Sequence, residues 1–115
     1  MKPLKYAYDG LVEACKTQLN MKIHLVAMIL VILTGILLDL TTTEWVLIAF
    51  CIGMVISTEL VNTALEYLVD LVSPEHNIQA GKVKDIAAAA VLIVSVMSLL
   101  IGLIIFAPKL LLVFR

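Results

Sequence analysis

Three long apolar stretches constrain the fold of this chain more than any other feature of its sequence. Residues 86–106 are 21 amino acids without a charged side chain, and residues 23–40 and 45–72 are apolar apart from a few polar positions. About 20 helical residues cross the hydrocarbon core of a typical bilayer. The sequence therefore predicts three transmembrane helices, at 23–40, 45–72 and 86–106, with Pro108 ending the last of them.

The overall composition also places the chain in a membrane. Hydrophobic residues make up 63% of the 115 amino acids and charged residues 15%, whereas soluble proteins average about 45–50% and about 25%. A soluble domain of this size has too small an interior to hide so many apolar side chains from water. The net charge of −1 leaves no basic field for nucleic acid, so that class of partner is excluded. We expect one integral membrane domain over residues 1–115.

The segment before the first stretch has a different pattern. Over residues 1–20, apolar side chains recur at helical spacing and most charged side chains fall between them. An amphipathic helix of this kind lies along a membrane surface. The alternative is a water-facing leader whose periodicity is accidental. The expected fold is thus all-α and integral to the membrane, with one amphipathic surface helix and three spans.

The distribution of basic residues predicts the orientation of the spans. Lysine and arginine are enriched in the cytoplasmic segments of membrane proteins. Three spans place the N-terminal segment and the 73–85 loop on one side, and these segments contain six lysines. The 39–44 turn and the C-terminal tail together contain two basic residues. We therefore expect the N-terminus and the long loop to lie in the cytoplasm.

Five polar side chains form a stripe on the second span. Because successive residues of an α-helix are 100° apart, the five fall within an arc of about 100°. They are Glu59, Asn62, Thr63, Glu66 and Asp70. Ionisable groups inside a span are costly and generally mark a functional site, and three carboxylates on one stripe repel each other unless a cation lies among them. Oxygen ligands of this type favour Mg²⁺. The alternative is that these groups only hold helices together.

The depth of this polar stripe indicates a reaction at the boundary between cytoplasm and bilayer. With Trp45 as the anchor at the outer interface, Glu59 lies about 21 Å along the helix and Glu66 about 31 Å. The hydrocarbon core is about 30 Å thick. Glu66 and Asp70 therefore reach the cytoplasmic interface, whereas Glu59 lies about 9 Å inside it. This geometry suits chemistry between a water-soluble reactant and one dissolved in the membrane.

A second polar pair stands where the third span enters the membrane. Lys84 can neutralise a phosphate as a point cation, and Asp85 can orient it. The alternative is an ordinary interfacial lysine beside an acid at the start of a helix. Small residues follow at 87–90 and let neighbouring helices approach closely. We expect the third span to pack against the polar stripe.

The motif Glu-x-x-Asn-Thr-Ala-x-Glu-x-x-x-Asp at 59–70, followed by Lys84-Asp85 and a run of alanines, resembles the prokaryotic diacylglycerol kinase family. The resemblance covers nearly the whole chain. Ile23-His24 and the tail IGLIIFAPKL are similar to the Gram-positive branch, whose members are often undecaprenol kinases. The resemblance implies a homotrimer of the bacterial inner membrane with active sites shared between protomers. It also implies that MgATP is used to phosphorylate a lipid hydroxyl.

The same resemblance implies roles for individual residues. Glu59 is the candidate general base for the lipid hydroxyl, Asn62 supports the same catalytic and substrate-binding site, and Glu66 is the principal Mg²⁺ ligand. The residues implied in nucleotide binding are Tyr6, Asp70, Lys84 and Asp85. Many members carry a glutamate before the first span that shares the metal. Gln18 stands there in this sequence, and we expect its neutral amide to take the second metal position with less electrostatic attraction.

Several functions remain open from the sequence. Undecaprenol is the expected lipid acceptor, and diacylglycerol is the alternative. A small ion-conducting or proton-relaying oligomer would line a pathway with Glu59 and Glu66, and an accessory subunit would carry out no chemistry. A kinase requires Lys84 and Asp85 beside the acidic stripe, whereas a pore requires the acids around a water-filled axis.

Overall fold

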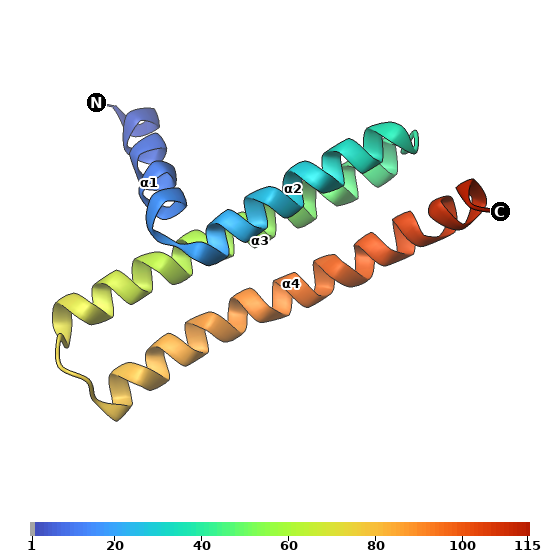
Figure 1. The fold of residues 1–115 in the computed structure, drawn as a ribbon. Coiled ribbons are helices and arrows are strands. Elements are labelled where there is room, and N and C mark those ends of the chain that lie inside the picture. Colours follow the sequence, from blue (N-terminus) through green and yellow to red (C-terminus); the bar gives the residue numbers. More distant parts are fainter. Residues whose placement is uncertain (1) are drawn as a thin grey trace.

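Four helices account for nearly all of residues 2–115, the part of the chain that the computed structural model describes (Figure 1). They are α1 (Pro3–Thr17), α2 (Leu19–Leu37), α3 (Thr42–Val72) and α4 (Ile78–Val113). Each of the last three is long and apolar enough to cross a membrane. The prediction of an all-α, multi-pass membrane protein with three spans is therefore confirmed.

The first helix, α1, is separated from α2 by a single residue. Gln18 has an extended backbone (φ −109°, ψ 115°), and this break lets α1 turn away from the direction of α2 (Figure 1). Ala14 is the one buried residue between Pro3 and Thr17. The helix predicted over residues 1–20 is thus found at Pro3–Thr17, Met1 lies outside the described residues, and contact with a membrane surface remains a prediction.

The turn between α2 and α3 contains the residues that determine where α3 begins. α2 ends at Leu37 rather than at residue 40, and α3 begins at Thr42 rather than at residue 45. The hydroxyl of Thr41 accepts a hydrogen bond from the backbone N–H of Glu44 (3.2 Å), and the Glu44 carboxylate accepts one from the N–H of Thr41 (2.9 Å). This reciprocal cap satisfies two backbone donors that the first turn of a helix otherwise leaves free.

The start of α4 lies earlier than the sequence predicts. The helix begins at Ile78 because the side chain of Asn77 accepts a hydrogen bond from the backbone N–H of Ala80 (2.8 Å) and caps it. The polar residues up to position 85, predicted as loop, therefore form the first turns of α4. Only residues 73–77 connect α3 to α4.

The end of α4 lies later than predicted. The helix continues through Pro108 to Val113, so the prediction that Pro108 ends it is wrong. A proline within a helix removes one backbone hydrogen bond. The next residue, Lys109, forms an ion pair with Glu44 at the start of α3 (3.1 Å), and this contact holds the last turns of α4 against the neighbouring span.

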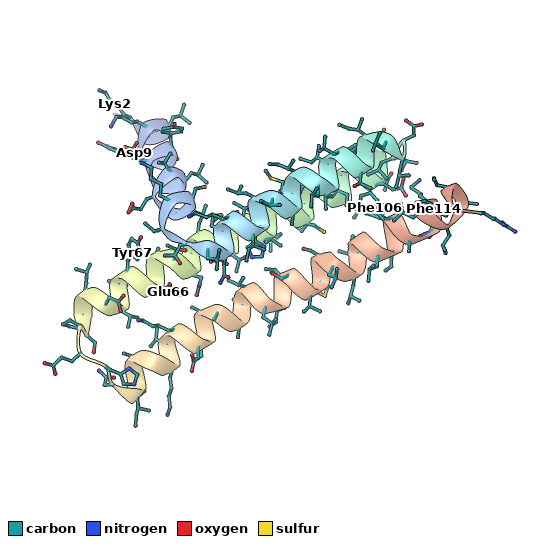
Figure 2. All side chains as sticks on the ribbon, viewed as in Figure 1. Lys2, Asp9, Glu66, Tyr67, Phe106 and Phe114 are labelled. Atoms are coloured by element: carbon teal, nitrogen blue, oxygen red, sulfur yellow. The ribbon has the colours of Figure 1, made fainter. Side chains whose placement is uncertain are left out.

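The central element of the protomer is α3, which contacts each of the other helices. α4 packs along α3, to which it is joined by residues 73–77. α2 precedes α3 in the chain and also packs against it (Figure 1). The apolar core is small and consists of Leu40, Ile48 and Ile105, with Trp45 and Phe106 packed against it. Most other apolar side chains are exposed in the protomer (Figure 2), as expected for surfaces that face lipid or other chains.

Gly35 marks a close approach between α2 and the start of α3. A β-carbon added there would lie 2.7 Å from Cη2 of Trp45 and 2.9 Å from Cδ1 of Leu40. We expect Gly35→Ala to destabilise the protein by about 1–3 kcal/mol, as overpacking usually does, and thermal unfolding in detergent measures this. Gly10→Ala is the control, because a β-carbon at Gly10 meets no atom within 4 Å. An unchanged melting temperature for Gly35→Ala would contradict the close packing.

Candidate active site

The polar stripe of α3 runs from the interior of the protomer to its surface. Glu59, Asn62 and Thr63 are buried, Glu66 is half-buried and Asp70 is exposed. At 1.5 Å per residue, about 16 Å separate the first of these residues from the last along the helix axis. A water-soluble reactant can therefore reach the Asp70 end, whereas Glu59 is removed from water.

Glu59 is a buried carboxylate with an unsatisfied oxygen. Its exposed fraction is 1%, and the Thr63 hydroxyl donates to its backbone carbonyl (3.0 Å) rather than to its carboxylate. Oε2 has no hydrogen-bond partner among the described residues. Burying such an oxygen without a donor is costly, and a carboxylate held in a protein interior can act as a general base.

His24 of α2 is the side chain that sequence reasoning did not connect with this site. Its Nε2 atom lies 3.7 Å from Oε2 of Glu59. The two residues are in different spans, so no helical period relates them. The available signal was a single histidine near the start of an otherwise apolar stretch, and that signal did not specify which residue of another helix it would meet.

Asn62 and Glu66, one turn apart, form a pair of oxygen donors. Asn62 Nδ2 donates to Oε1 of Glu66 (3.2 Å), while Asn62 Oδ1 is buried without a hydrogen-bond partner in residues 2–115. An unpaired amide oxygen beside a carboxylate fits Mg²⁺, which prefers hard oxygen ligands. Within the described chain no three His, Cys, Asp or Glu side chains form a group that could hold a metal. A protomer therefore offers part of a coordination shell, which Mg²⁺ commonly completes with waters and substrate phosphates.

The junction between α1 and α2 lies at the same level of α3 as Glu66. The Thr17 hydroxyl is 3.0 Å from the hydroxyl of Tyr67, and Tyr67 is the neighbour of Glu66 in the chain (Figure 2). Gln18 follows Thr17 and is half-buried. The structure thus brings the segment that carries Gln18 next to Tyr67, one residue from Glu66 in the chain, and the metal role of Gln18 stays a prediction.

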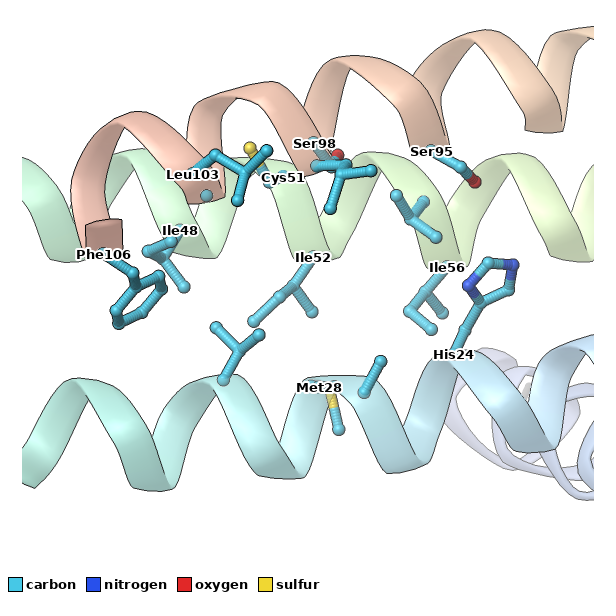
Figure 3. A pocket seen from close by; sticks show the side chains of 15 residues that line it. His24, Met28, Ile48, Cys51, Ile52, Ile56, Ser95, Ser98, Leu103 and Phe106 are labelled. Atoms are coloured by element: carbon cyan, nitrogen blue, oxygen red, sulfur yellow. The ribbon is translucent and has the colours of Figure 1, made fainter. Parts of the chain in front are cut away.

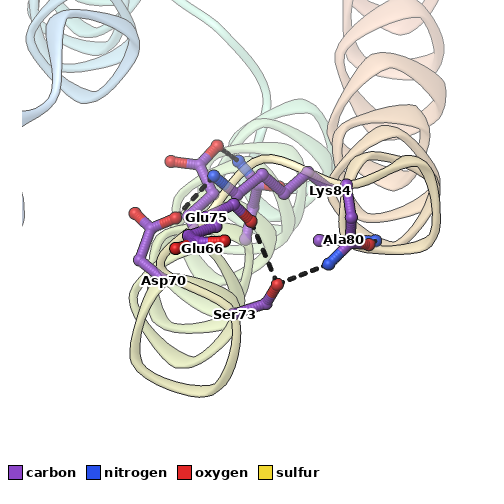
Figure 4. Close-up of polar contacts among 8 residues, drawn as sticks. Glu66, Asp70, Ser73, Glu75, Ala80 and Lys84 are labelled. Atoms are coloured by element: carbon purple, nitrogen blue, oxygen red, sulfur yellow. Dashed lines mark hydrogen bonds and ion pairs between the residues drawn. The ribbon is translucent and has the colours of Figure 1, made fainter.

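Lys84 links α4 to the exposed end of the stripe. Its Nζ donates to Oδ1 of Asp70 at 2.7 Å (Figure 4), and the two side chains are 39% and 63% exposed. Together with Asp85 they line a pocket of about 370 Å³ beside the α3–α4 connection. Three of the predicted nucleotide-binding residues therefore lie around one pocket.

Tyr6 does not join these three residues within the protomer. Its side chain is 69% exposed. It lies in the first half of α1, and α1 points away from α4 (Figure 1). If Tyr6 contacts a nucleotide bound beside Lys84, that nucleotide must lie in the pocket of another copy of the chain.

An apolar cleft of about 380 Å³ opens between α2, α3 and α4 (Figure 3). Phe106 lies at one end, and His24 and Ser95 lie at the other (Figure 3). The Ser95 hydroxyl is buried without a hydrogen-bond partner in the part of the chain that the structure describes. The polar end of the cleft is therefore the end at which His24 approaches Glu59.

Comparison with known proteins accounts for this combination of a membrane fold and a polar stripe. Residues 5–106, which include every residue of the candidate site, match the family described as prokaryotic diacylglycerol kinase. The chain belongs to this family. It is therefore a lipid kinase, the family implies ATP as its phosphoryl donor, and the pore and accessory-subunit alternatives are set aside.

Individual members of the prokaryotic diacylglycerol kinase family are similar over most of the chain. An undecaprenol kinase of Bacillus subtilis is 41% identical over 109 residues, which are 95% of this chain and 89% of that protein. A diacylglycerol kinase of Synechocystis sp. is 35% identical over 93% of this chain and 62% of its own length. The diacylglycerol kinase of Escherichia coli K12 is 28% identical over 87% of this chain and 82% of its own length. The resemblance drawn from the 59–70 motif is thus confirmed.

Proposed function

We propose that this lipid kinase transfers the γ-phosphoryl group of ATP to undecaprenol, giving undecaprenyl phosphate and ADP. The observation that carries this choice of acceptor is the 41% identity to the B. subtilis undecaprenol kinase, against 35% and 28% for the two diacylglycerol kinases. Diacylglycerol remains the second candidate, because its hydroxyl would approach Glu59 from the same interface.

The apolar cleft supports an acceptor with one hydroxyl and a long hydrocarbon chain. Apart from His24, Ser95 and Ser98, the side chains that line it are apolar. Ester carbonyls buried in such a lining would lack hydrogen-bond donors, which is unfavourable. Diacylglycerol has two ester groups, whereas a polyprenol has none. The polar end of the cleft suits the single hydroxyl, and the rest of the chain continues into the bilayer.

In the proposed reaction, Glu59 accepts the proton of the lipid hydroxyl while the hydroxyl oxygen bonds to the γ-phosphorus of ATP. The bond between the γ-phosphorus and the β–γ bridging oxygen breaks, and ADP leaves with that oxygen. Phosphoryl transfer depends on positioning and charge neutralisation more than on covalent chemistry. Glu59 and the Asn62–Glu66 pair lie about 5–10 Å apart along α3, so acceptor, γ-phosphate and the remaining phosphates can follow the helix in that order.

The negative charge of the ATP phosphates would be neutralised at two places, the middle of the stripe and its exposed end. Glu66 and Asn62 would hold Mg²⁺, which neutralises charge on the β- and γ-phosphates when it is bound. Lys84 supplies a second positive charge to the phosphates, and its contact with Asp70 (2.7 Å) keeps its side chain extended across the pocket. Asp85 stands at the same pocket and orients the lysine or the nucleotide.

A homotrimer would complete this site. One protomer leaves Glu66 half-buried and Tyr6 far from the nucleotide pocket, and its spans expose much of their apolar surface. Neighbouring copies would enclose the carboxylates and could present Tyr6 to an adjacent nucleotide. We place this assembly in the bacterial inner membrane, with the N-terminus and the Lys84 pocket on the cytoplasmic side, where ATP is available.

The role of Gln18 can be tested by adding a charge. Gln18→Glu is expected to lower the Mg²⁺ concentration that gives half-maximal activity, because hard cations prefer a carboxylate to an amide oxygen. The new carboxylate also repels Glu66, but this repulsion acts only while the metal is absent and does not weaken the bound state. Asn20→Asp, which adds the same charge at an exposed position two residues away, is the control. An unchanged or raised Mg²⁺ requirement for Gln18→Glu would remove Gln18 from the metal site.

The orientation can be tested with a single cysteine. Glu75 is exposed in the connection between α3 and α4, and it is preferable to Asn77, whose side chain caps α4. In a background without Cys15 and Cys51, Glu75→Cys should resist membrane-impermeant thiol reagents in intact cells and react after permeabilisation. Reaction in intact cells would invert the proposed topology.

The choice of acceptor is tested with defined lipids. The purified protein in lipid nanodiscs is supplied with MgATP and equal mole fractions of undecaprenol or dioleoylglycerol, and kcat/KM is measured for each. We expect at least about a tenfold preference for undecaprenol, which corresponds to about 1.4 kcal/mol of differential transition-state stabilisation. Equal or reversed values would favour diacylglycerol.

A further inference from the structure

The approach of His24 to Glu59 has no role in the reaction described so far. Glu59 Oε2 lies 3.7 Å from His24 Nε2. Catalytic hydrogen bonds are often long before substrate binds, and a small rotation of either side chain would bring this pair within hydrogen-bonding distance. The side chain of His24 is 20% exposed and that of Glu59 is 1% exposed, so water competes little for the contact.

The surroundings of Glu59 leave His24 as the group that can orient its carboxylate. The Thr63 hydroxyl donates to the Glu59 backbone and not to its side chain. The amide of Asn62 is directed to Glu66 (3.2 Å). Oε2 of Glu59 therefore has no hydrogen-bond donor among residues 2–115, and the one ion-pair contact that the carboxylate makes there is with His24.

We infer that His24 is a positioning residue that orients the Glu59 carboxylate toward the lipid hydroxyl. This inference rests on the proposed function above. An imidazole can donate from Nε2 in its neutral or its protonated form. When it donates to Oε2, the carboxylate plane is held, and the other oxygen is left to accept the proton of the acceptor lipid. A base held in a productive geometry contributes more than one that rotates freely.

The cleft connects this contact to the substrate. His24 lines the polar end of the cleft, and the unpaired Ser95 hydroxyl lies at the same end (Figure 3). One side of the imidazole thus borders the space that suits a lipid chain, while its Nε2 approaches the base. A hydroxyl that enters at this end meets His24 and Ser95, and Glu59 of a third span lies 3.7 Å from Nε2 of this histidine.

Two substitutions separate a positioning role from a packing role. His24→Phe keeps a ring of similar size and removes the donor, whereas His24→Gln keeps an N–H donor on a side chain of comparable reach. Ile23→Phe places the same ring at the neighbouring position, which is 54% exposed and does not line the cleft. Wild type and the three variants are assayed in nanodiscs with undecaprenol and MgATP, together with thermal unfolding.

We expect His24→Phe to lower kcat by about 10- to 100-fold, as the loss of one hydrogen bond to a charged group does. The KM for MgATP and the melting temperature should stay near wild type, His24→Gln should recover most of kcat, and Ile23→Phe should resemble wild type. A wild-type kcat in His24→Phe would overturn the inference. So would a Gln variant as slow as the Phe variant, or a loss of kcat matched by a loss of stability. If the proposed function fails instead, wild type itself transfers no phosphate to undecaprenol.

Discussion

Glu59→Gln is expected to lower kcat by about 10²- to 10⁴-fold, the usual contribution of a general base. Glutamine has nearly the same shape as glutamate but cannot accept the proton of the lipid hydroxyl. Because the side chain is 1% exposed, removing its charge also removes a desolvation cost, so the variant should be at least as stable as wild type. The KM for MgATP and the Mg²⁺ requirement should remain near wild type, since Asn62, Glu66 and Lys84 are unchanged.

The control for this variant is Glu13→Gln, the same chemical change at an exposed position of α1. It should leave kcat at the wild-type value. Turnover within a few-fold of wild type for Glu59→Gln, with labelled lipid phosphate as the readout, would exclude Glu59 as the base. The polar stripe would then act only through the proposed contacts of Glu66, Asn62 and Asp70 with Mg²⁺ and the nucleotide.

Glu66→Gln is expected to reduce activity by about 100-fold or more. Groups that merely support a metal ligand are worth about 10–100-fold in affinity or activity, and Glu66 is proposed as a ligand itself. The loss should be partly reversed at high Mg²⁺, because an amide oxygen still binds the cation weakly. Titration of activity against Mg²⁺ therefore separates this variant from Glu59→Gln, which should not respond to added metal.

The oligomer provides the check on Glu66→Gln. Native mass spectrometry in detergent should show the proposed trimer for wild type and for this variant alike. Dissociation of the variant into monomers would show that Glu66 holds protomers together, and its effect on activity would then be indirect. Active wild-type protein found as a monomer would contradict the trimer.

Local patterns in the sequence were sufficient for the spans and the stripe. Hydropathy depends on the residues of one segment, and the 100° period places Glu59, Asn62 and Glu66 on one side of α3 without knowledge of any partner helix. The limits of α4 were less predictable. A polar segment after Asn77 can be loop or helix, and a hydrogen bond from Ala80 to the Asn77 side chain decides in favour of helix.

Contacts between helices depend on how each helix is rotated and how far it slides along its neighbour, and no sequence period contains that information. The approach of His24 to Glu59 and the contact of Thr17 with Tyr67 are of this kind. The small residues at 87–90 predicted that the span beginning near Lys84 packs against the stripe, and the 2.7 Å contact of Lys84 with Asp70 agrees. Tyr6 shows the reverse case: its nucleotide contact stays a prediction, because in the proposed trimer that contact would be made with a neighbouring copy of the chain.

The most direct test of the proposed function follows the labelled phosphate without choosing the acceptor in advance. The purified chain in nanodiscs that contain a total bacterial lipid extract is given [γ-³²P]ATP and Mg²⁺, and the labelled lipid is identified by chromatography and mass spectrometry. We predict one dominant product, undecaprenyl phosphate, formed by wild type and almost absent with Glu66→Gln. Labelled phosphatidic acid would show that the acceptor is diacylglycerol rather than undecaprenol. If wild type formed no labelled lipid, this would contradict the assignment of a lipid kinase.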